Sequence, residues 1–449
     1  MIDIVPRGRA RAAESTRVSR LDVLVADIDV AIVVGPVEGG TDDELLAVLR
    51  EFGRRGPAPR VLLTPRMDAR RWDVLDDVDD GFLRPGPDGI GTGGSIDDRK
   101  LSEALLDVLA DDRTRPIQVG IRDGFLVHVF NHGMGDGRLA LEVVVALSGA
   151  GSRERAEIGG AEPHAPLPRT ILAIIRHRPV QFGKAVWHVG VRAMAARGQP
   201  RPGRDPAPNT ALAVQAEAAG GTGTGMEVVV CRGEPGSLSR IDAARRARSS
   251  AASRGAVIAY HLGRGLQAAG VTLTDDIGVL VDVRERTSDA ADFSMGNAFA
   301  VVGVPLADGV DLTAFGAAYH RAVSGENALA RLLFSLTVRY PLVRLARRKK
   351  SAAAAGDAGR PAALTVSDVT PMPVLKSMRW LADPERPAVF AVASTPAAAN
   401  HLAAYVTEAR GRLFLSVSFQ RSGFPREVIE AGLRDALGML EDWCEGSGR

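Results

Sequence analysis

The stretch FLVHVFNHGMGDGRLALEVVVAL, residues 125–147, connects two apolar segments through a short polar and glycine-rich turn. The first segment has the composition of a β-strand, and the second, which begins at Gly137, that of an apolar helix. A plain turn requires glycine and aspartate but not histidine. His132 lies on the strand face that also carries positions 128 and 130, so a rigid element can hold its imidazole at the edge of a cleft. Because imidazole titrates near neutrality, we predict that His132 is a general base.

The other polar residues near this turn have predicted roles as well. Asp136 is expected to orient the loop or the imidazole ring, and Gly137 to let the backbone bend tightly into the helix. The alternative for His132 is a polar residue in an ordinary turn, but its place between a strand and an apolar helix favours the functional interpretation. His128 is predicted to be a hydrogen-bonded interior histidine, with a place in the wall of a substrate tunnel as the alternative.

The composition excludes several classes of protein. The chain has 449 residues, of which 45% are hydrophobic, and this length suits two domains of about 200 residues each. Lys and Arg number 56 against 54 Asp and Glu, so the charge gives no reason to expect a nucleic-acid partner. Cys231 and Cys444 are the only cysteines, which argues against a disulfide framework and a structural zinc site. We expect a cytoplasmic protein without a signal peptide, a membrane span or a bound metal.

Elements alternate along the first half of the chain. Helices are predicted over 18–26, 42–54, 97–112, from 137 onward and over 170–197, and strands over 29–37, 60–65, 117–121 and 125–132. The turn Arg122-Asp123-Gly124 makes the last two strands a β-hairpin. A proline-rich linker at 199–210 and a glycine-rich loop at 216–225 separate this half from the next. We therefore predict two lobes, residues 1–205 and 206–449.

The second half repeats the mixture of strands and helices. Strands are predicted over 226–232, 277–284, 298–306, 364–369, 389–394, 403–408 and 412–419, and helices over 236–268, 311–348 and from Pro425. The fold class is therefore α/β, built as two lobes of similar size.

HGMGDG at 132–137 resembles the HHxxxDG motif of the CoA-dependent acyltransferase superfamily. That superfamily includes chloramphenicol acetyltransferase, nonribosomal peptide synthetase condensation domains, plant BAHD acyltransferases and bacterial wax ester synthase/diacylglycerol acyltransferases. The approach to the motif, DRTRPIQVGIRDGFLVHVFN, is similar to the wax-ester and condensation branches. Weaker likeness follows in VLVDVRERT (279–287), DFSMGNAFAVVGVPL (292–306) and LTVSDV (364–369).

The resemblance implies a fold and a set of roles. The fold is two chloramphenicol acetyltransferase-like lobes, each a mixed sheet with flanking helices, arranged in a V around a central tunnel. His132 matches the catalytic base, Gly137 the glycine beside it, and Asp136 a structural aspartate that pairs with an arginine, here Arg284. No cofactor is bound permanently; the co-substrate is a thioester of CoA or of a phosphopantetheinyl carrier protein.

The sequence departs from the family pattern at the motif and beyond it. Asn131 replaces the first histidine, Asp368 stands where the wax-ester branch has asparagine, and SMG replaces GWG after Asp292-Phe293. The hydroxyl of Ser367 and the backbone N–H near Gly137 are candidates for steadying an oxyanion. Gly133 and Met134, with Asn131, are candidates for the tunnel wall beside His132, although the glycines also suit the backbone angles of a turn.

The predicted function is acyl transfer from a CoA or carrier-protein thioester to a hydroxyl or amine acceptor, in specialised metabolism or lipid assembly. The sequence contains no GxSxG, HExxH or GxxxxGK[ST] motif, which argues against an ordinary esterase, a zinc protease and a P-loop enzyme. One alternative is a non-catalytic protein of the same fold that binds a carrier protein or a lipid. The basic and apolar stretch 329–350 favours packed helices, with a membrane-surface contact or carrier docking as alternatives.

Overall fold

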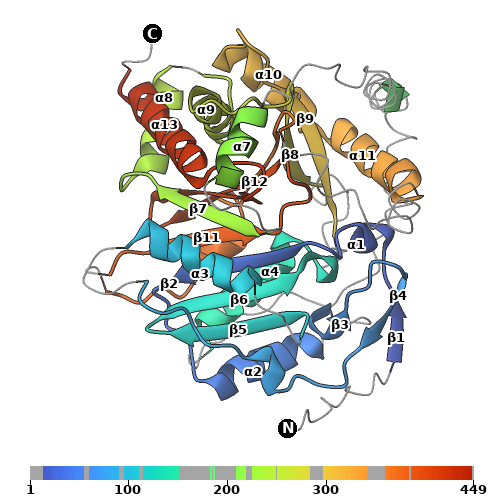
Figure 1. The fold of residues 1–449 in the computed structure, drawn as a ribbon. Helices are drawn as coiled ribbons and strands as arrows, with labels where there is room; N and C mark the ends of the chain where they lie inside the picture. The colour runs from blue at the N-terminus through green and yellow to red at the C-terminus, as the bar shows by residue number, and fades with distance from the viewer. Residues whose placement is uncertain are drawn as a thin grey trace.

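The computed structural model describes residues 14–54, 60–90, 96–110, 115–150, 180, 183–184, 186–187, 209–218, 225–248, 250–283, 297–341, 359–383 and 386–446. Most of the predicted helical stretch 170–197, the linker up to residue 208 and Arg284 lie outside these ranges. Sheets with flanking helices occupy both halves of the chain, as the mixed α/β prediction requires (Figure 1).

A four-stranded antiparallel sheet carries the predicted motif. Its order is β11-β2-β6-β5, formed by Val389–Ser394, Asp29–Gly35, Phe125–Asn131 and Ile117–Arg122. The predicted hairpin β5–β6 is confirmed, and its turn residues Asp123 and Gly124 have φ angles of 51° and 79°, as a tight hairpin turn favours. β2 and β6 are almost wholly buried because they lie in the middle of this sheet between packed layers.

Three helices pack around the four-stranded sheet. α2 (Asp42–Gly53) begins at Thr41, whose side chain forms a capping box with Glu44. α3 (Asp98–Ala110) contacts β2 and β11, and α4 (Gly137–Ser148) follows the motif. Their apolar residues join one continuous core with the strands, including Leu45, Leu105 and Val144.

A small sheet borders this unit, and the sequence prediction was wrong there. Its order is β1-β4-β3, formed by Glu14–Arg17, Arg71–Val74 and Leu63–Thr64, and neither β1 nor β4 was predicted. In the predicted strand 60–65, only Leu63–Thr64 is β-strand, and the first three residues form a 3₁₀ turn, η1 (Arg60–Leu62). α1 (Arg20–Leu24) lies beside it and, like α2, begins with a capping box, here formed by Ser19 and Asp22.

A six-stranded mixed sheet forms the rest of the molecule. Its order is β7-β13-β12-β10-β8-β9, from Met226–Arg232, Arg412–Gln420, His401–Ala409, Ala363–Asp368, Asp276–Asp282 and Phe299–Pro305. β10 is parallel to both neighbours, and the other pairs are antiparallel. A second core lies between this sheet and its helices.

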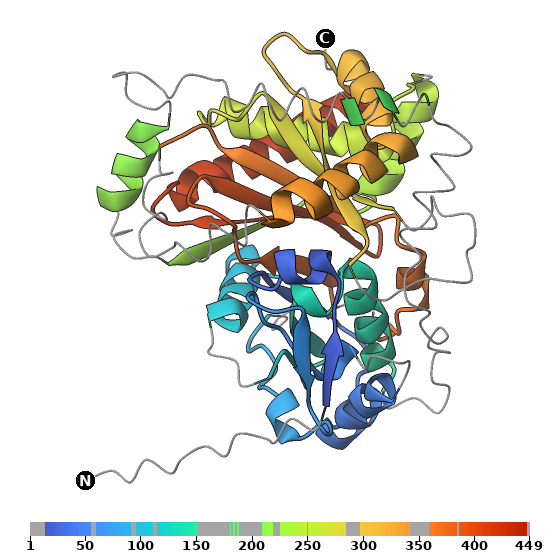
Figure 2. The ribbon, with the colours of Figure 1, turned by 90° about the vertical axis from the view of Figure 1, so that its right-hand side faces the viewer.

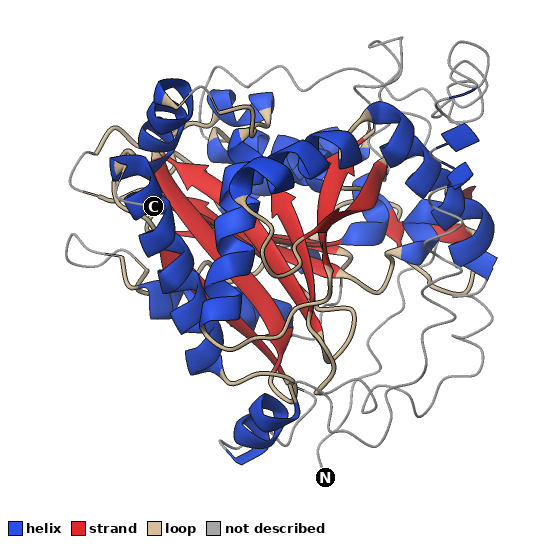
Figure 3. Ribbon diagram, turned by 90° about the horizontal axis from the view of Figure 1, so that it is seen from above, coloured by secondary structure: helices blue, strands red, loops and turns tan. Residues whose placement is uncertain are grey.

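The helices of the second half cover one side of the six-stranded sheet. α8 (Ser237–Ala247), α9 (Arg254–Ala268) and α13 (Arg426–Glu445) lie together at one end of the molecule, and α2 lies at the other (Figure 1). Seen from above, helices cross in front of the strands (Figure 3). Also present are α10 (Leu312–Ala322), α11 (Gly325–Phe334), a π-helical turn over Ser335–Arg339 and α7 (Thr210–Ala218). α7 includes residues 216–218, which the sequence placed in a loop.

The two sheets do not divide the chain at a single point. Most of the first half forms one block in Figure 2 and most of the second half the other. β11, however, comes from the second half and pairs with β2 over six residues, from Val389 opposite Gly35 to Ser394 opposite Val30. The boundary at 205 lies outside the described residues, so the two lobes and their V arrangement stay predictions. In the described part of the chain, no helix is both long and apolar enough to cross a membrane.

Candidate active site

The predicted motif forms a short turn between β6 and α4. β6 ends at Asn131, and His132–Met134 form a 3₁₀ turn, η3. The backbone N–H of His132 donates to the carbonyl oxygen of Ile28 at 2.8 Å, which ties the turn to the start of β2. The structure therefore places His132 at the end of a buried strand, as the alternation in the sequence indicated.

A cavity of about 790 Å³, measured with its open mouth, lies between the two sheets beside this turn. α4 supplies one wall, the four-stranded sheet a second, and β8, β9, β10 and β12 a third. Apolar side chains dominate the lining, and polar groups gather at a few places. The lining residues that the following paragraphs use are His132, Asp136, Gly137, Phe299, Ser367 and Tyr405.

The imidazole of His132 lies in an aromatic and largely dry environment. Its ring centroid is 5.2 Å from that of Phe299 and 6.3 Å from that of Phe130. Only 9% of the residue is exposed, and Nδ1 is buried without a hydrogen-bond partner among the described residues. A histidine held in this way at a cavity wall has the placement that a general base needs.

Asp136 joins the motif to the second half of the chain. Its Oδ1 accepts from the backbone N–H of Arg138 at 3.1 Å, which caps α4, and its Oδ2 accepts from that of Ala298 at 3.1 Å. Arg284, the predicted partner, lies outside the described residues. Gly137 is exposed at the cavity, and a Cβ on it would meet nothing within 4 Å.

Asn131 precedes the turn and Gly133 and Met134 belong to it, but none of the three lines this cavity. Asn131 accepts from the N–H of Gly133 at 3.0 Å and donates to Ala26 O at 3.0 Å and Asp29 Oδ1 at 2.9 Å. A Cβ on Gly133 would lie 2.7 Å from the Trp72 ring. Met134 is fully buried in the first core. In place of the motif's first histidine, Asn131 therefore braces the turn through three hydrogen bonds.

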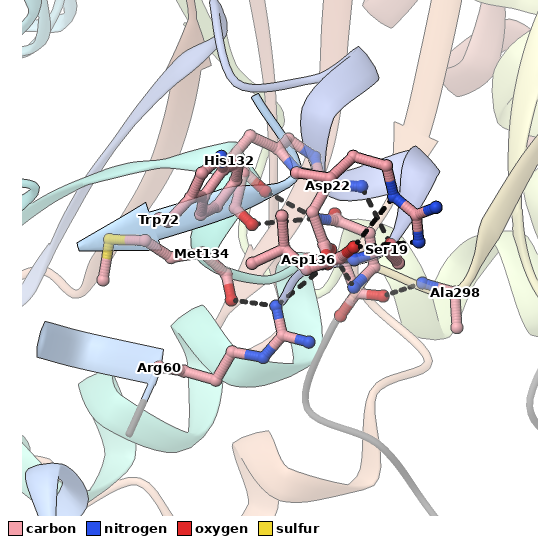
Figure 4. A network of polar contacts seen from close by, with 12 residues as sticks. Ser19, Asp22, Arg60, Trp72, His132, Met134, Asp136 and Ala298 are labelled. Atoms are coloured by element: carbon pink, nitrogen blue, oxygen red, sulfur yellow. Dashed lines mark hydrogen bonds and ion pairs between the residues drawn. The ribbon is translucent and has the colours of Figure 1, made fainter. Parts of the chain in front are cut away.

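A buried polar network fixes the other side of the turn (Figure 4). The side-chain amide of Asn297 donates to His132 O at 2.8 Å and to Asp22 Oδ1 at 2.9 Å. Arg60 pairs with Asp22 at 3.3 Å and donates to Met134 O at 3.2 Å. Asp22 is completely buried. Four segments that are distant in the sequence therefore meet at the candidate base.

Two polar groups on the opposite wall belong to β10. Ser367 lines the cavity, where the sequence predicted an oxyanion donor. Asp368 also lines it, and its Oδ1 accepts from Thr370 N at 3.0 Å and Thr370 Oγ1 at 2.7 Å. Burial raises the pKa of Asp368, while the Thr370 hydrogen bonds and the nearby Arg254 oppose that rise. Of the two, Ser367 is thus the better candidate to donate a hydrogen bond to an oxyanion, because its hydroxyl does not change charge with pH.

His128 differs from its prediction. It was expected to be hydrogen-bonded, but both ring nitrogens are buried without a partner among the described residues. Its ring stacks on Phe130 with centroids 5.3 Å apart. Burial lowers the pKa of His128 to about 3, so the imidazole is neutral at physiological pH.

The similarity of this chain to known proteins lies in the fold. No protein-family model and no curated protein matches the sequence. The structure resembles trichothecene 15-O-acetyltransferase TRI3 from Fusarium sporotrichioides, with a TM-score of 0.60 at 11% identity over 96% of this chain and 95% of that one. It also resembles the EpoB nonribosomal peptide synthetase cyclization-docking bidomain from Sorangium cellulosum, with a TM-score of 0.58 at 12% identity over 97% and 85%. Polyketide synthase associated protein 5 from Mycobacterium tuberculosis gives 0.53 at 12% identity over 96% and 98%.

The chain has the acyltransferase and condensation-domain fold. This confirms the fold family that the HGMGDG motif suggested. The sequence analysis predicted roles for His132 and Asp136 and assigned none to Asn297, Asp22 or Arg60. The Gly-Asn pair in DFSMGNAF was the one available signal for Asn297. Among the described residues no group of three His, Cys, Asp or Glu side chains is placed to hold a metal ion.

Proposed function

We propose that this protein is an acyltransferase that moves an acyl group from a CoA or carrier-protein thioester to a hydroxyl or amine acceptor. The observation that supports it most is the position of His132, at the end of a rigid strand and in the wall of a partly apolar cavity. The fold likeness to an acetyltransferase and to a synthetase bidomain favours the same chemistry and leaves both kinds of donor open.

The reaction needs one base and no covalent enzyme intermediate. Because Nδ1 of His132 is buried, Nε2 takes the proton from the acceptor as its oxygen or nitrogen attacks the thioester carbonyl. The carbonyl oxygen then carries a negative charge, which the Ser367 hydroxyl and the backbone N–H near Gly137 would stabilise. The intermediate collapses, the C–S bond breaks, and the imidazolium returns its proton to the thiolate.

Thiol release tests this function directly. Purified protein is incubated with acyl-CoA or acyl-phosphopantetheinyl carrier protein and a panel of alcohols and amines, and free thiol and product mass are measured. We expect acceptor-dependent release in the wild type and a loss in kcat on the order of 10²–10⁴ in His132→Ala. His320→Ala, at an exposed position on α10, is the matched control and should retain full activity.

Two outcomes would contradict the proposal. Unchanged turnover in His132→Ala would remove the base from the mechanism. Tight binding of a carrier protein or lipid without any thiol release, across the whole panel, would instead support a non-catalytic member of the fold.

A further inference from the structure

Asn297 lies two residues before β9 and 165 positions along the chain from His132, yet its side chain contacts the candidate base's own backbone. Its amide nitrogen donates to His132 O at 2.8 Å and Asp22 Oδ1 at 2.9 Å, and its backbone N–H donates to Asp22 Oδ1 at 3.2 Å. Only 8% of Asn297 is exposed. Among the neutral side chains of this size, a primary amide is the one that donates two hydrogen bonds from a single nitrogen.

The same network holds both ends of the 3₁₀ turn. Asn297 binds the carbonyl oxygen of His132, at the first position, and Arg60 binds that of Met134, at the last, at 3.2 Å. Asp22 connects the two through its contacts with Asn297 and Arg60, and it is itself fixed by its capping box with Ser19. We call Asp22, Arg60 and Asn297 the turn clamp.

The clamp also fixes the surroundings of the imidazole. The residue after Asn297 is Ala298, whose N–H donates to Asp136 Oδ2 at 3.1 Å. The residue after that is Phe299, whose ring lies 5.2 Å from the His132 ring and lines the cavity. The segment Asn297–Phe299 of the second half therefore binds the turn, binds the residue that caps α4, and supplies one aromatic wall of the site.

Such a clamp matters because a general base loses effectiveness when it moves by a fraction of the proton-transfer distance. β6 and α4 hold the ends of the turn, but the carbonyl oxygens of His132 and Met134 accept from clamp side chains. Without Asn297, the His132 carbonyl would be a buried acceptor that has lost its amide donor, and the turn would relax to satisfy it.

We propose that Asn297 is a positioning residue for acyl transfer: it holds the His132 turn at the angle from which the imidazole reaches the acceptor. This inference rests on the proposed function. It requires that removal of the amide lowers kcat far more than it raises KM, because the cavity that binds substrate stays in place while the base is displaced.

Asn297→Ala tests the proposal, with Asn209→Ala as the matched control. Asn209 is also buried, at 1% exposure, and its amide also donates two hydrogen bonds, to Thr272 O and Arg360 O at 2.9 Å, but it does not line the cavity. We expect both variants to lower the melting temperature. Only Asn297→Ala should lower kcat, by about 10²-fold, with KM changed less than about threefold. Equal losses of kcat in the two variants would overturn the proposal.

A second measurement keeps this test separate from the proposed function. Diethyl pyrocarbonate modifies unprotonated imidazole, and mass spectrometry gives the rate at His132 without any substrate. Asn297→Ala should change that rate severalfold and Asn209→Ala should not. If the wild type shows no acyl transfer, the proposed function fails, and this rate alone decides whether Asn297 positions His132; an unchanged rate refutes it.

Arg60→Lys covers the case in which Asn297→Ala does not fold. Arg60 contacts both Asp22 and Met134 O from one nitrogen, Nη1. Lysine keeps the positive charge, but its shorter side chain does not reach the Nη1 position. We expect a severalfold lower kcat at unchanged KM and a changed modification rate at His132. Wild-type values for all three quantities would refute the clamp.

Discussion

The His128 side chain is a buried polar group on β6. It is 1% exposed and stacks on Phe130, and neither ring nitrogen has a hydrogen-bond partner among the described residues. A buried polar group without a partner costs about 1–3 kcal/mol. His128 therefore destabilises the folded state even as a neutral ring, and its protonation would destabilise it further.

We predict that His128→Leu raises the melting temperature and flattens its dependence on pH. The pKa of His128 is about 3 when folded, below its ordinary value of 6.5, so the unfolded chain binds the proton first. Stability is therefore fully present above pH 6.5 and is lost as pH falls toward 3. At pH 5 the loss is about 2 kcal/mol.

Thermal unfolding between pH 8 and 5 measures this. The wild type should lose stability on acidification more steeply than His128→Leu, whereas the exposed control His320→Gln should follow the wild type. Parallel curves for wild type and His128→Leu would show that His128 is not the group that titrates.

At single residues, the sequence predicted groups that carry local patterns and missed groups that act over long distances. His132 and Asp136 stand in one hexapeptide, and Asp136 caps the helix that the apolar run predicted. Asn297, Asp22 and Arg60 have no sequence signal in common, because only the folded chain brings them together. His128 was given a hydrogen bond because most buried histidines have one.

At the scale of elements, the parallel pairing of β10 with β12 arranges the polar side of the cavity. Ser367 lies opposite Tyr405 in the register of these strands, and both line the cavity. Burial raises the pKa of Tyr405 to about 12, so its phenol remains a hydrogen-bond donor at physiological pH. Strands were predicted at 364–369 and 403–408, but their pairing was not, since the sequence of one strand does not show which strand lies parallel to it.

We predict that Ser367→Ala lowers kcat by about 10²-fold with little change in KM, because an oxyanion donor acts in the transition state and not on bound substrate. Tyr405→Phe, which keeps the ring, should cost less, since Ser394 also interacts with this phenol. Ser416, opposite Tyr405 on β13, is buried and does not line the cavity. Ser416→Ala is therefore the control, and a loss of kcat there equal to that in Ser367→Ala would refute the assignment.

The elements that the sequence missed are short and depend on their neighbours. β1 (ESTR) and β4 (RWDV) have too few residues to show the alternation of apolar and polar side chains that is typical of a strand. Their sheet forms around Trp72, which is fully buried and whose indole N–H donates to Arg66 O at 2.9 Å. RVLLTP was predicted as a strand because of its apolar run, but Val61 and Leu62 reach the first core from a 3₁₀ turn.

At the scale of the whole molecule, β11 ties the two halves of the chain together. All six of its residues are buried, and it pairs with β2 along its full length while contacting β12 and β13. The turn clamp adds a second connection, because Asn297 of the second half binds Asp22 and His132 of the first. The predicted division into 1–205 and 206–449 therefore separates two bodies that share a sheet.

We predict from this that residues 1–205 do not fold alone. Without β11, one edge of β2 would expose unpaired backbone groups beside apolar side chains, which favours aggregation. Co-expression with 206–449 should recover a soluble complex, because the missing strand returns. Co-expression with a 206–449 fragment in which residues 389–394 are replaced by Gly-Ser repeats should not.

The full chain should unfold in a single calorimetric transition, since neither half keeps its core without the other. A soluble, folded monomer of 1–205, or two separate transitions in the full chain, would contradict this prediction. Either result would show that the lobes are independent and that the first sheet is stable without β11.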